Sequence, residues 1–332
     1  MTADPLLAPL LERFFTQRLM MQRQVSAHTI ASYRDTFRLL LAFAQQQRRT
    51  PPSRLLLSDV DAPLIDGFLN EVEKRRHCTP RSRNLRLTAL RSFFRFCAFE
   101  VPTHAGQIQR VLAIPAKREV HPLIGFLTRP EIEALLAAPD RQSWGGRRDY
   151  AFLYVALQTG LRLSELTSLT RADLKLEPGA HVRVHGKGRK ERCTPLTRQT
   201  AAVLKAWLNE PPRGAADVLF PSIRGGRLSS DAAQDLLAKH LAVARARCPS
   251  LVTKRVTIHV LRHSAAMELL QSGVDATVIA LWLGHESIKT TQIYLEADLA
   301  LKEAALAKAT PITAKLKRYR PSDELLAFLN NL

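Results

Sequence analysis

Hydrophobic residues recur at helical spacing through most of residues 1–112. In residues 26–47 the apolar side chains follow a period of about 3.6 residues, and Ser26 stands where a helix N-cap is expected. Residues 59–76 and 79–100 repeat this pattern. We therefore predict an all-helical amino-terminal domain.

The helical pattern stops after this domain and a different one begins. Residues 113–127 lose the periodicity and contain two prolines, which favours a linker. Thr128 and Glu131 then have the spacing of a capping box at the start of a new helix. We predict four segments, namely a helical domain at 1–114, a linker at 115–127, a second domain at 128–312, and a basic linker with an amphipathic helix at 313–332.

The second domain has mixed periodicity. Residues 181–196 alternate between apolar and polar side chains, break at a glycine-rich turn and then alternate again, which predicts a β-hairpin. Most of the remaining segments are helical, including one with Asp275 as its N-cap and Gly284 as its helix-ending residue. The fold class is therefore mainly α with a small β-sheet.

Charge gives the first indication of a partner. The chain has 49 Lys and Arg against 30 Asp and Glu, a net charge of +19 and a pI of about 10.4, which favours nucleic acid. A basic protein with no such partner is the alternative. The helical residues 79–100 are rich in arginine, and solvent exposure alone is the alternative to DNA contact for each of Arg81, Arg83, Arg86, Arg91 and Arg95.

Other features narrow the class of protein. The four cysteines show neither metal-ligand spacing nor a disulfide pattern. No apolar run approaches the roughly 20 residues that a membrane helix needs, and no secretory leader is evident. We predict a cytoplasmic protein without membrane association.

Several chemically capable residues lie at element boundaries in the second domain. Arg162 and Glu165 are three residues apart, as are His259 and Arg262, so each pair can share a helix face. Each has an ordinary explanation when taken alone, such as a surface ion pair. The hairpin tip carries Lys187, with Arg189 and Lys190 as further candidates for DNA contact. His285 follows a helix end, and Tyr294 lies nine positions later.

Together these residues meet the needs of one reaction. Displacing an alcohol from a phosphodiester requires a nucleophile, cations on the phosphoryl oxygens and a proton donor for the leaving oxygen. Tyr294 could be the nucleophile, the two arginines could hold the phosphate, and Lys187 could be the acid. The sequence shows no acidic cluster with metal-binding spacing, and we predict no cofactor and no metal.

Four motifs carry a family resemblance. TGLRLSEL, HGKGRKER, HVLRH and LGHESIKTTQIY resemble the signatures of the tyrosine recombinase (phage integrase) family, with the Xer-like recombinases and mobile-element integrases as the most similar members. Residues 26–100 resemble the family's core-binding (SAM-like) domain. The resemblance implies an all-helical core-binding domain and an α+β catalytic domain, which together form a C-shaped clamp on DNA.

The resemblance also implies roles for individual residues. Tyr294 would form a 3′-phosphotyrosyl link, Arg162 and Arg262 would hold the phosphate, and Lys187 rather than Lys190 would protonate the 5′ oxygen. His259 would assist proton transfer at Tyr294, His285 would bond the phosphate, and Glu165 would orient the basic groups. One departure is visible, because Glu296 stands where many relatives have histidine two positions after the tyrosine.

The expected partner is double-stranded DNA. The resemblance implies a homotetramer, or a heterotetramer with a second recombinase, and residues 321–332 could pack on a neighbour or on their own domain. A type IB topoisomerase and a DNA-binding protein that does not cleave are the alternatives. The sequence names neither the target site nor the biological role, which could be dimer resolution, integration or transposition.

Overall fold

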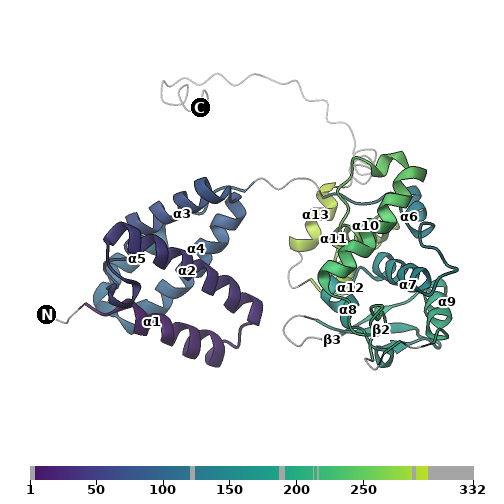
Figure 1. The fold of residues 1–332 in the computed structure, drawn as a ribbon, viewed down its shortest axis with the longest axis horizontal. Coiled ribbons are helices and arrows are strands. Elements are labelled where there is room, and N and C mark those ends of the chain that lie inside the picture. Colours follow the sequence, from purple (N-terminus) through teal and green to yellow (C-terminus); the bar gives the residue numbers. More distant parts are fainter. Residues whose placement is uncertain are drawn as a thin grey trace, which may run out of the picture. The chain divides into compact units, whose positions relative to one another are not determined.

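The chain folds as two compact units, residues 1–121 and 122–332, which we call unit 1 and unit 2 (Figure 1). The computed structural model describes residues 4–119, 124–186, 191–211, 213–214, 217–285 and 289–297. The division falls within the predicted linker. The limits of the four predicted segments stay predictions, and the segment 313–332 lies outside the described residues.

The secondary-structure elements described in unit 1 are all helices or helical turns. The three predicted helices are confirmed, and the side chain of Ser26 caps the first of them by accepting a hydrogen bond from the backbone N–H of Thr29. In chain order its elements are α1 (Leu7–Arg13), a π-helical turn (Phe14–Gln22), α2 (Ala27–Arg48), a 3-10 turn (Pro52–Arg54), α3 (Ala62–Arg76), α4 (Pro80–Glu100), a 3-10 turn (Pro102–His104) and α5 (Ala105–Ala113).

The core of unit 1 is built around phenylalanines. The ring of Phe93 in α4 packs edge-on against Phe14 and Phe37, with centroids 5.4 and 5.3 Å away. All three side chains are buried, and such edge-to-face contacts add to the stabilisation from removing their apolar surface from water. This core joins α2 and α4 to the first residues of the unit.

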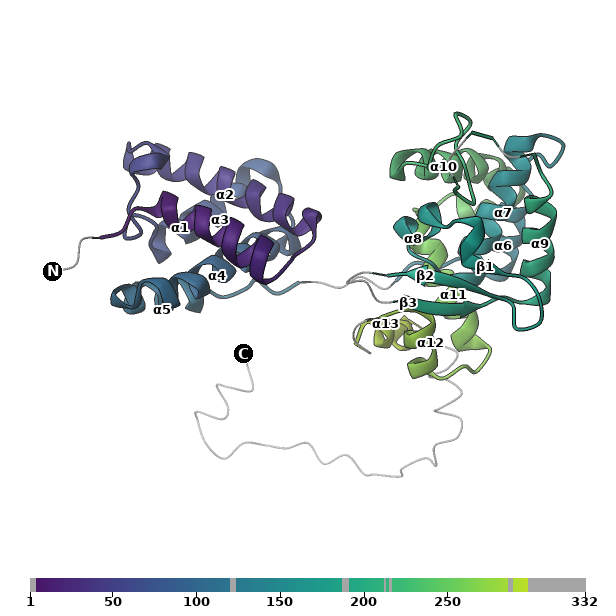
Figure 2. The same ribbon diagram turned by 90° about the horizontal axis from the view of Figure 1, so that it is seen from below.

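Unit 2 combines helices with a small antiparallel sheet. Figure 2 shows the three strands side by side in the order β1-β2-β3. The predicted hairpin strands are confirmed as β2 and β3, with Val184 opposite Arg192, whereas the two-residue β1 was not predicted. The elements are α6 (Arg129–Leu136), α7 (Trp144–Thr159), α8 (Leu163–Ser168), a 3-10 turn (Arg171–Asp173), β1 (Leu174–Lys175), β2 (His181–His185), β3 (Glu191–Pro195), α9 (Arg198–Leu208), α10 (Ser230–Arg247), a 3-10 turn (Pro249–Leu251), α11 (Ile258–Gln271), α12 (Ala276–Leu283) and α13 (Lys289–Ala297).

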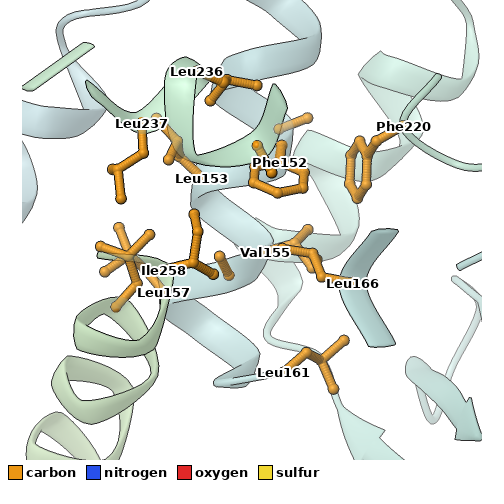
Figure 3. Packing of buried hydrophobic residues seen from close by; sticks show 14 of the residues in the cluster. Phe152, Leu153, Val155, Leu157, Leu161, Leu166, Phe220, Leu236, Leu237 and Ile258 are labelled. Atoms are coloured by element: carbon orange, nitrogen blue, oxygen red, sulfur yellow. The ribbon is translucent and has the colours of Figure 1, made fainter. Parts of the chain in front are cut away.

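The main core of unit 2 surrounds α7. Figure 3 shows Phe152 and Leu153 of this helix facing Leu236, Leu237 and other apolar side chains from neighbouring elements. α7 ends at Gly160, whose φ of +62° is a left-handed conformation that favours glycine. The packing therefore fixes where the chain leaves α7 and enters α8.

A second, smaller core lies between α11, α12 and α13. It contains Met267, Ile279, Leu283 and the predicted nucleophile, Tyr294. The predicted N-cap Asp275 and the predicted helix end Gly284 of α12 are both confirmed. No helix within the described ranges is both long enough and apolar enough to span a membrane.

Candidate active site

The candidate site forms where the carboxyl ends of α7 and α12 meet. Both helices end in a left-handed glycine, Gly160 with φ +62° and Gly284 with φ +66°. A Cβ atom added at Gly160 would lie only 2.6 Å from Cδ2 of Leu283, so the two helix ends are in close contact. Because the end of a helix leaves carbonyls unpaired and carries partial negative charge, this junction favours positive side chains.

Three arginines occupy this junction. Arg162 precedes α8, Arg192 lies in β3 and Arg262 lies in α11. Each of the last three carbonyls at the end of α12 accepts a hydrogen bond from a different one of them: Trp282 O from Arg192 Nε (3.2 Å), Leu283 O from Arg262 Nη2 (2.8 Å) and Gly284 O from Arg162 Nη2 (2.8 Å). The guanidinium groups are thus positioned by main-chain atoms.

Glu165 holds two of these arginines together. Its Oε1 accepts hydrogen bonds from Nη1 of Arg162 (2.9 Å) and Nη1 of Arg192 (3.0 Å), while its Oε2 accepts from Nη2 of Arg192 (2.8 Å). Burial alone would raise the pKa of Glu165, but the hydrogen bonds from Arg192 and Arg162 outweigh it and lower the pKa. The predicted pair Arg162–Glu165 is confirmed, although Arg162 lies at the N-cap of α8 and not within the helix.

The two predicted phosphate-binding arginines differ in exposure. Arg262 is 2 % exposed, and burial together with the charge of Arg162 lowers its pKa to about 10. It remains charged at neutral pH, and its Nη1 also donates to Gly160 O at 2.7 Å. The side chain of Arg162 is 36 % exposed. A phosphate can therefore approach Arg162 from solvent, with Arg262 behind it.

The candidate nucleophile is held in the small core. Tyr294 is 2 % exposed, and its hydroxyl lies 3.0 Å from Nδ1 of His263. Burial raises the pKa of Tyr294, and the positive charges of Arg262 and Arg162 partly offset this effect. The hydroxyl is therefore protonated at neutral pH, and it shares a hydrogen bond with Nδ1 of His263 whose direction depends on the imidazole tautomer.

His263 is a site residue that sequence reasoning missed. The signal was present in HVLRH, since His263 lies four residues after His259 and thus on the same face of α11. The two imidazole rings lie 4.4 Å apart between centroids. The structure therefore places His263, and not His259, in contact with the tyrosine hydroxyl, while the predicted role of His259 in proton transfer stays a prediction.

The two half-buried histidines of the site are uncharged at neutral pH. Burial, with His259 and Arg262 nearby, lowers the pKa of His263 to about 4. Burial and the charges of Arg262 and Arg162 lower the pKa of His285 to about 4 as well. The ring of His285 lies nearly parallel to that of Tyr294, and its Nδ1 is 2.8 Å from the hydroxyl of Thr291.

The other predicted site residues are placed less completely. Lys187, Arg189 and Lys190 lie outside the described residues. In α4, Arg83 is only 3 % exposed and donates to Pro115 O, while Arg91 donates to Ile114 O. These two arginines hold the chain that leaves α5. All five predicted DNA contacts in α4 stay predictions, with Arg81 and Arg95 exposed, Arg86 and Arg91 half-buried and Arg83 buried.

A metal site was not predicted. Within the part of the chain that the structure describes, no three His, Cys, Asp or Glu side chains are grouped so that they could hold an ion. The prediction that no cofactor is needed stays a prediction.

Comparison with known proteins identifies the family. The family described as "Phage integrase family" matches residues 125–300, and "Phage integrase, N-terminal SAM-like domain" matches residues 11–100. The chain belongs to the phage integrase family. The resemblance that the four motifs carry is thereby confirmed, as are the SAM-like domain and the mainly helical catalytic domain.

Individual relatives agree with this assignment. The chain is 64 % identical over 332 residues to the putative integrase/recombinase y4rC of Sinorhizobium fredii, covering 100 % of both chains. It is 34 % identical over 284 residues to tyrosine recombinase XerC of Xanthomonas campestris, covering 86 % of this chain and 83 % of XerC. The family is therefore that of the tyrosine recombinases.

Solved structures share the fold. XerH recombinase bound to its palindromic difH substrate in a post-cleavage complex superimposes with a TM-score of 0.65 at 22 % identity, covering 86 % of this chain and 81 % of that one. At this identity the likeness supports the fold alone.

Proposed function

We propose that this chain is a site-specific DNA recombinase in which Tyr294 is the nucleophile. Its Oη attacks the scissile phosphate, a 3′-phosphotyrosyl bond forms and the bond to the 5′ oxygen breaks. A 5′-hydroxyl from a partner strand then attacks the tyrosyl ester and releases the tyrosine. The number of phosphodiester bonds is unchanged, so the reaction needs no nucleotide hydrolysis.

The observation that carries this proposal is the arrangement around Tyr294. A tyrosine hydroxyl, two neutral imidazoles and two guanidinium groups belong to one site, although they come from different elements of unit 2. Phosphoryl transfer depends mainly on positioning and on neutralising charge on the phosphoryl oxygens. Arg162 and Arg262 would supply that charge.

The remaining roles follow from the same geometry. Glu165 orients Arg162 through a hydrogen bond of 2.9 Å, and a phosphate oxygen can accept from the guanidinium donors that Arg162 does not use internally. Lys187, which follows the end of β2 by two positions in the sequence, would donate the proton to the leaving 5′ oxygen. His285, stacked beside Tyr294, would bond the phosphate during attack.

The nucleophile must change position before it reacts. At 2 % exposure, Tyr294 offers almost no surface to a phosphate in solvent. Its hydroxyl must leave Nδ1 of His263 when DNA occupies the arginine pair. The hydroxyl loses its proton as the bond to phosphorus forms, and the predicted role of His259 is to assist this transfer.

The substrate we propose is double-stranded DNA. The XerH structure shows a protein with this fold bound to its palindromic difH substrate. A net charge of +19 supports phosphate contacts that weaken steeply with salt. We further propose that the two units close around the duplex, that four copies act on two DNA segments, and that this occurs in the cytoplasm.

A metal-free cleavage assay tests the proposal. Nicked duplexes tiled across the DNA that flanks the gene are incubated in chelator with the chain and with Tyr294→Phe, then separated on denaturing gels. We expect a covalent protein–DNA adduct that the variant lacks. Binding without any adduct would instead support a non-cleaving DNA-binding protein, and relaxation of supercoils without recombinants would support a topoisomerase.

A further inference from the structure

We infer that Arg192 is a positioning residue that keeps Arg162 aligned for the scissile phosphate. It acts by holding Glu165 and the carboxyl end of α12 in place. The inference rests on the proposed function and assigns a role to a residue outside the predicted catalytic set. Arg192 lies in β3, at the edge of the hairpin and away from the motifs that carry the two phosphate-binding arginines.

Arg192 uses its donors inside the protein. Nε donates to Trp282 O, and the two Nη groups form a forked pair with the two carboxylate oxygens of Glu165. Its side chain is 14 % exposed, against 36 % for Arg162. Arg192 is therefore built into the site wall, and Arg162 is the one presented to a substrate.

The influence on Arg162 passes through the shared carboxylate. Glu165 is 5 % exposed and also accepts the backbone N–H of Arg162 at 2.9 Å. Of its two described guanidinium partners, the Glu165 carboxylate would keep only Arg162 if Arg192 were removed. Arg162 would then be drawn toward Glu165, and the site would lose one positive charge. Both changes weaken its hold on a phosphate.

Arg192 also explains why a glycine ends α12. A Cβ atom added at Gly284 would lie 2.8 Å from Nη1 and 3.0 Å from Cζ of Arg192. The guanidinium thus fills the space that a side chain at position 284 would need. Gly284 O accepts a hydrogen bond from Arg162, and His285 is the next residue. By packing against Gly284, Arg192 therefore supports Arg162 and His285, the two residues that would contact the phosphate.

The same residue connects the hairpin to the site. β3 pairs with β2 in the register His185 opposite Glu191, and Lys187 precedes Arg192 by five positions. The bond from Arg192 to Trp282 O therefore anchors to α12 the strand that follows the proposed acid. Lysine cannot hold Glu165 in the same way, because it lacks the planar fork that a carboxylate accepts.

A charge-neutral substrate tests this role. In a methylphosphonate, a methyl group replaces one non-bridging oxygen, so the scissile group has no negative charge for the arginines to hold. Nicked duplexes with either a phosphate or a methylphosphonate at the scissile position are given to the wild-type chain, Arg192→Ala and Arg192→Lys. The single-turnover rate of adduct formation is measured.

We expect the rate on the phosphate duplex to fall on the order of 100-fold in Arg192→Ala and less in Arg192→Lys. On the methylphosphonate duplex the difference from wild type should shrink to a few-fold. A role confined to stability would instead slow both substrates equally, and that result overturns the inference.

Arg147→Ala is the matched control. Arg147 forms the same forked pair with Glu210 and also donates to two main-chain carbonyls, but it lies about 20 Å from the active end of α7, given 1.5 Å per residue. It should lose stability without changing the ratio of the two rates. If the wild-type chain forms no adduct on either duplex, the proposed function fails and the inference fails with it. If the wild-type chain is active and Arg192→Ala slows adduct formation equally on both duplexes, only the inference fails.

Discussion

The two halves of the active site are built in opposite ways. On the phosphate side, three arginines and Glu165 are charged, and their hydrogen bonds fix them to the ends of α7 and α12. On the nucleophile side, Tyr294 lies in an apolar cluster between two neutral histidines, with one hydrogen bond at its hydroxyl. The phosphate side is thus formed before substrate binds, whereas the nucleophile is buried and must move to reach a substrate.

The difference follows from the cost of burying each kind of group. A buried guanidinium is stable only when several acceptors replace water, so its position is determined by many bonds at once. A tyrosine ring packs in an apolar core and needs one partner for its hydroxyl. Substitutions in the two halves should therefore differ in the size of their effect and in the measurement that detects it.

The largest effect is expected at Arg262. Arg262→Ala removes the buried charge behind the phosphate, and we expect the rate of adduct formation to fall on the order of 1000-fold. Arg245 is the matched control, because it also donates to two main-chain carbonyls, Leu251 O and Lys254 O. Near-normal cleavage by Arg262→Ala, with Arg245→Ala unchanged, would show that the phosphate side is not preformed around this residue.

The next effect is expected at Glu165. Glu165→Gln breaks a buried network that includes two ion pairs, so the free energy of unfolding of unit 2 should fall by about 3 kcal/mol. All three tryptophans lie in unit 2, so tryptophan fluorescence in urea follows this unit alone. Glu133→Gln, which breaks an exposed pair with Arg129, should change stability by less than about 1 kcal/mol. Equal losses of unfolding free energy in the two variants would show that the buried network contributes no more than an exposed ion pair.

The nucleophile side should respond to pH. The pKa of His263 and of His285 is about 4 in the folded chain against 6.5 as the ordinary value, so the unfolded chain binds protons more readily between these values. Stability is therefore complete above pH 6.5 and declines as the pH falls toward 4, by on the order of 1 kcal/mol per histidine after solvent screening.

Urea unfolding followed by tryptophan fluorescence at pH 7 and pH 5 measures this dependence. His285→Gln should flatten it, since His285 faces the charges of Arg262 and Arg162. His28→Gln, on the surface of unit 1, is the control and should leave the slope unchanged. A slope that survives the loss of His285 and His263 together would locate the proton uptake elsewhere.

The smallest effect is expected at the buried hydroxyl of Tyr294. His263→Ala removes its partner, worth about 1 kcal/mol, so Tyr294 should react about fivefold faster with tetranitromethane in the absence of DNA. Peptide mass mapping isolates Tyr294 from the other tyrosines. His259→Ala, a neighbouring imidazole of the same helix, serves as the control for a general loosening of α11. If nitration of Tyr294 in His263→Ala were unchanged or slower, apolar packing alone would keep this side chain buried.

Local sequence was sufficient for the elements and for part of the site. The caps at Ser26 and Asp275 and the glycine ending of α12 were predicted correctly, since each depends on residues within a few positions. The pairing of Arg162 with Glu165 was predicted for the same reason. The four motifs then identified the family.

The missed features depend on contacts between distant segments. Arg192 shares the less exposed face of β3 with Thr194, and its partners lie 27 and 90 positions away. Arg83 and Arg91 were grouped with exposed arginines because their carbonyl acceptors belong to the irregular chain after α5. No periodicity reveals which cation finds a main-chain acceptor in the folded protein.

The run of three arginine-bound carbonyls gives α12 a fixed length. One residue inserted into this helix would turn its end by about 100° and advance it by about 1.5 Å, so all three carbonyls would leave their arginines together. Because the three acceptors are main-chain carbonyls, side-chain substitutions in α12 leave the acceptors present, whereas a change of length moves all three. Insertions and deletions between Asp275 and Gly284 should therefore be absent from active members of this lineage, even where the amino acids themselves vary freely.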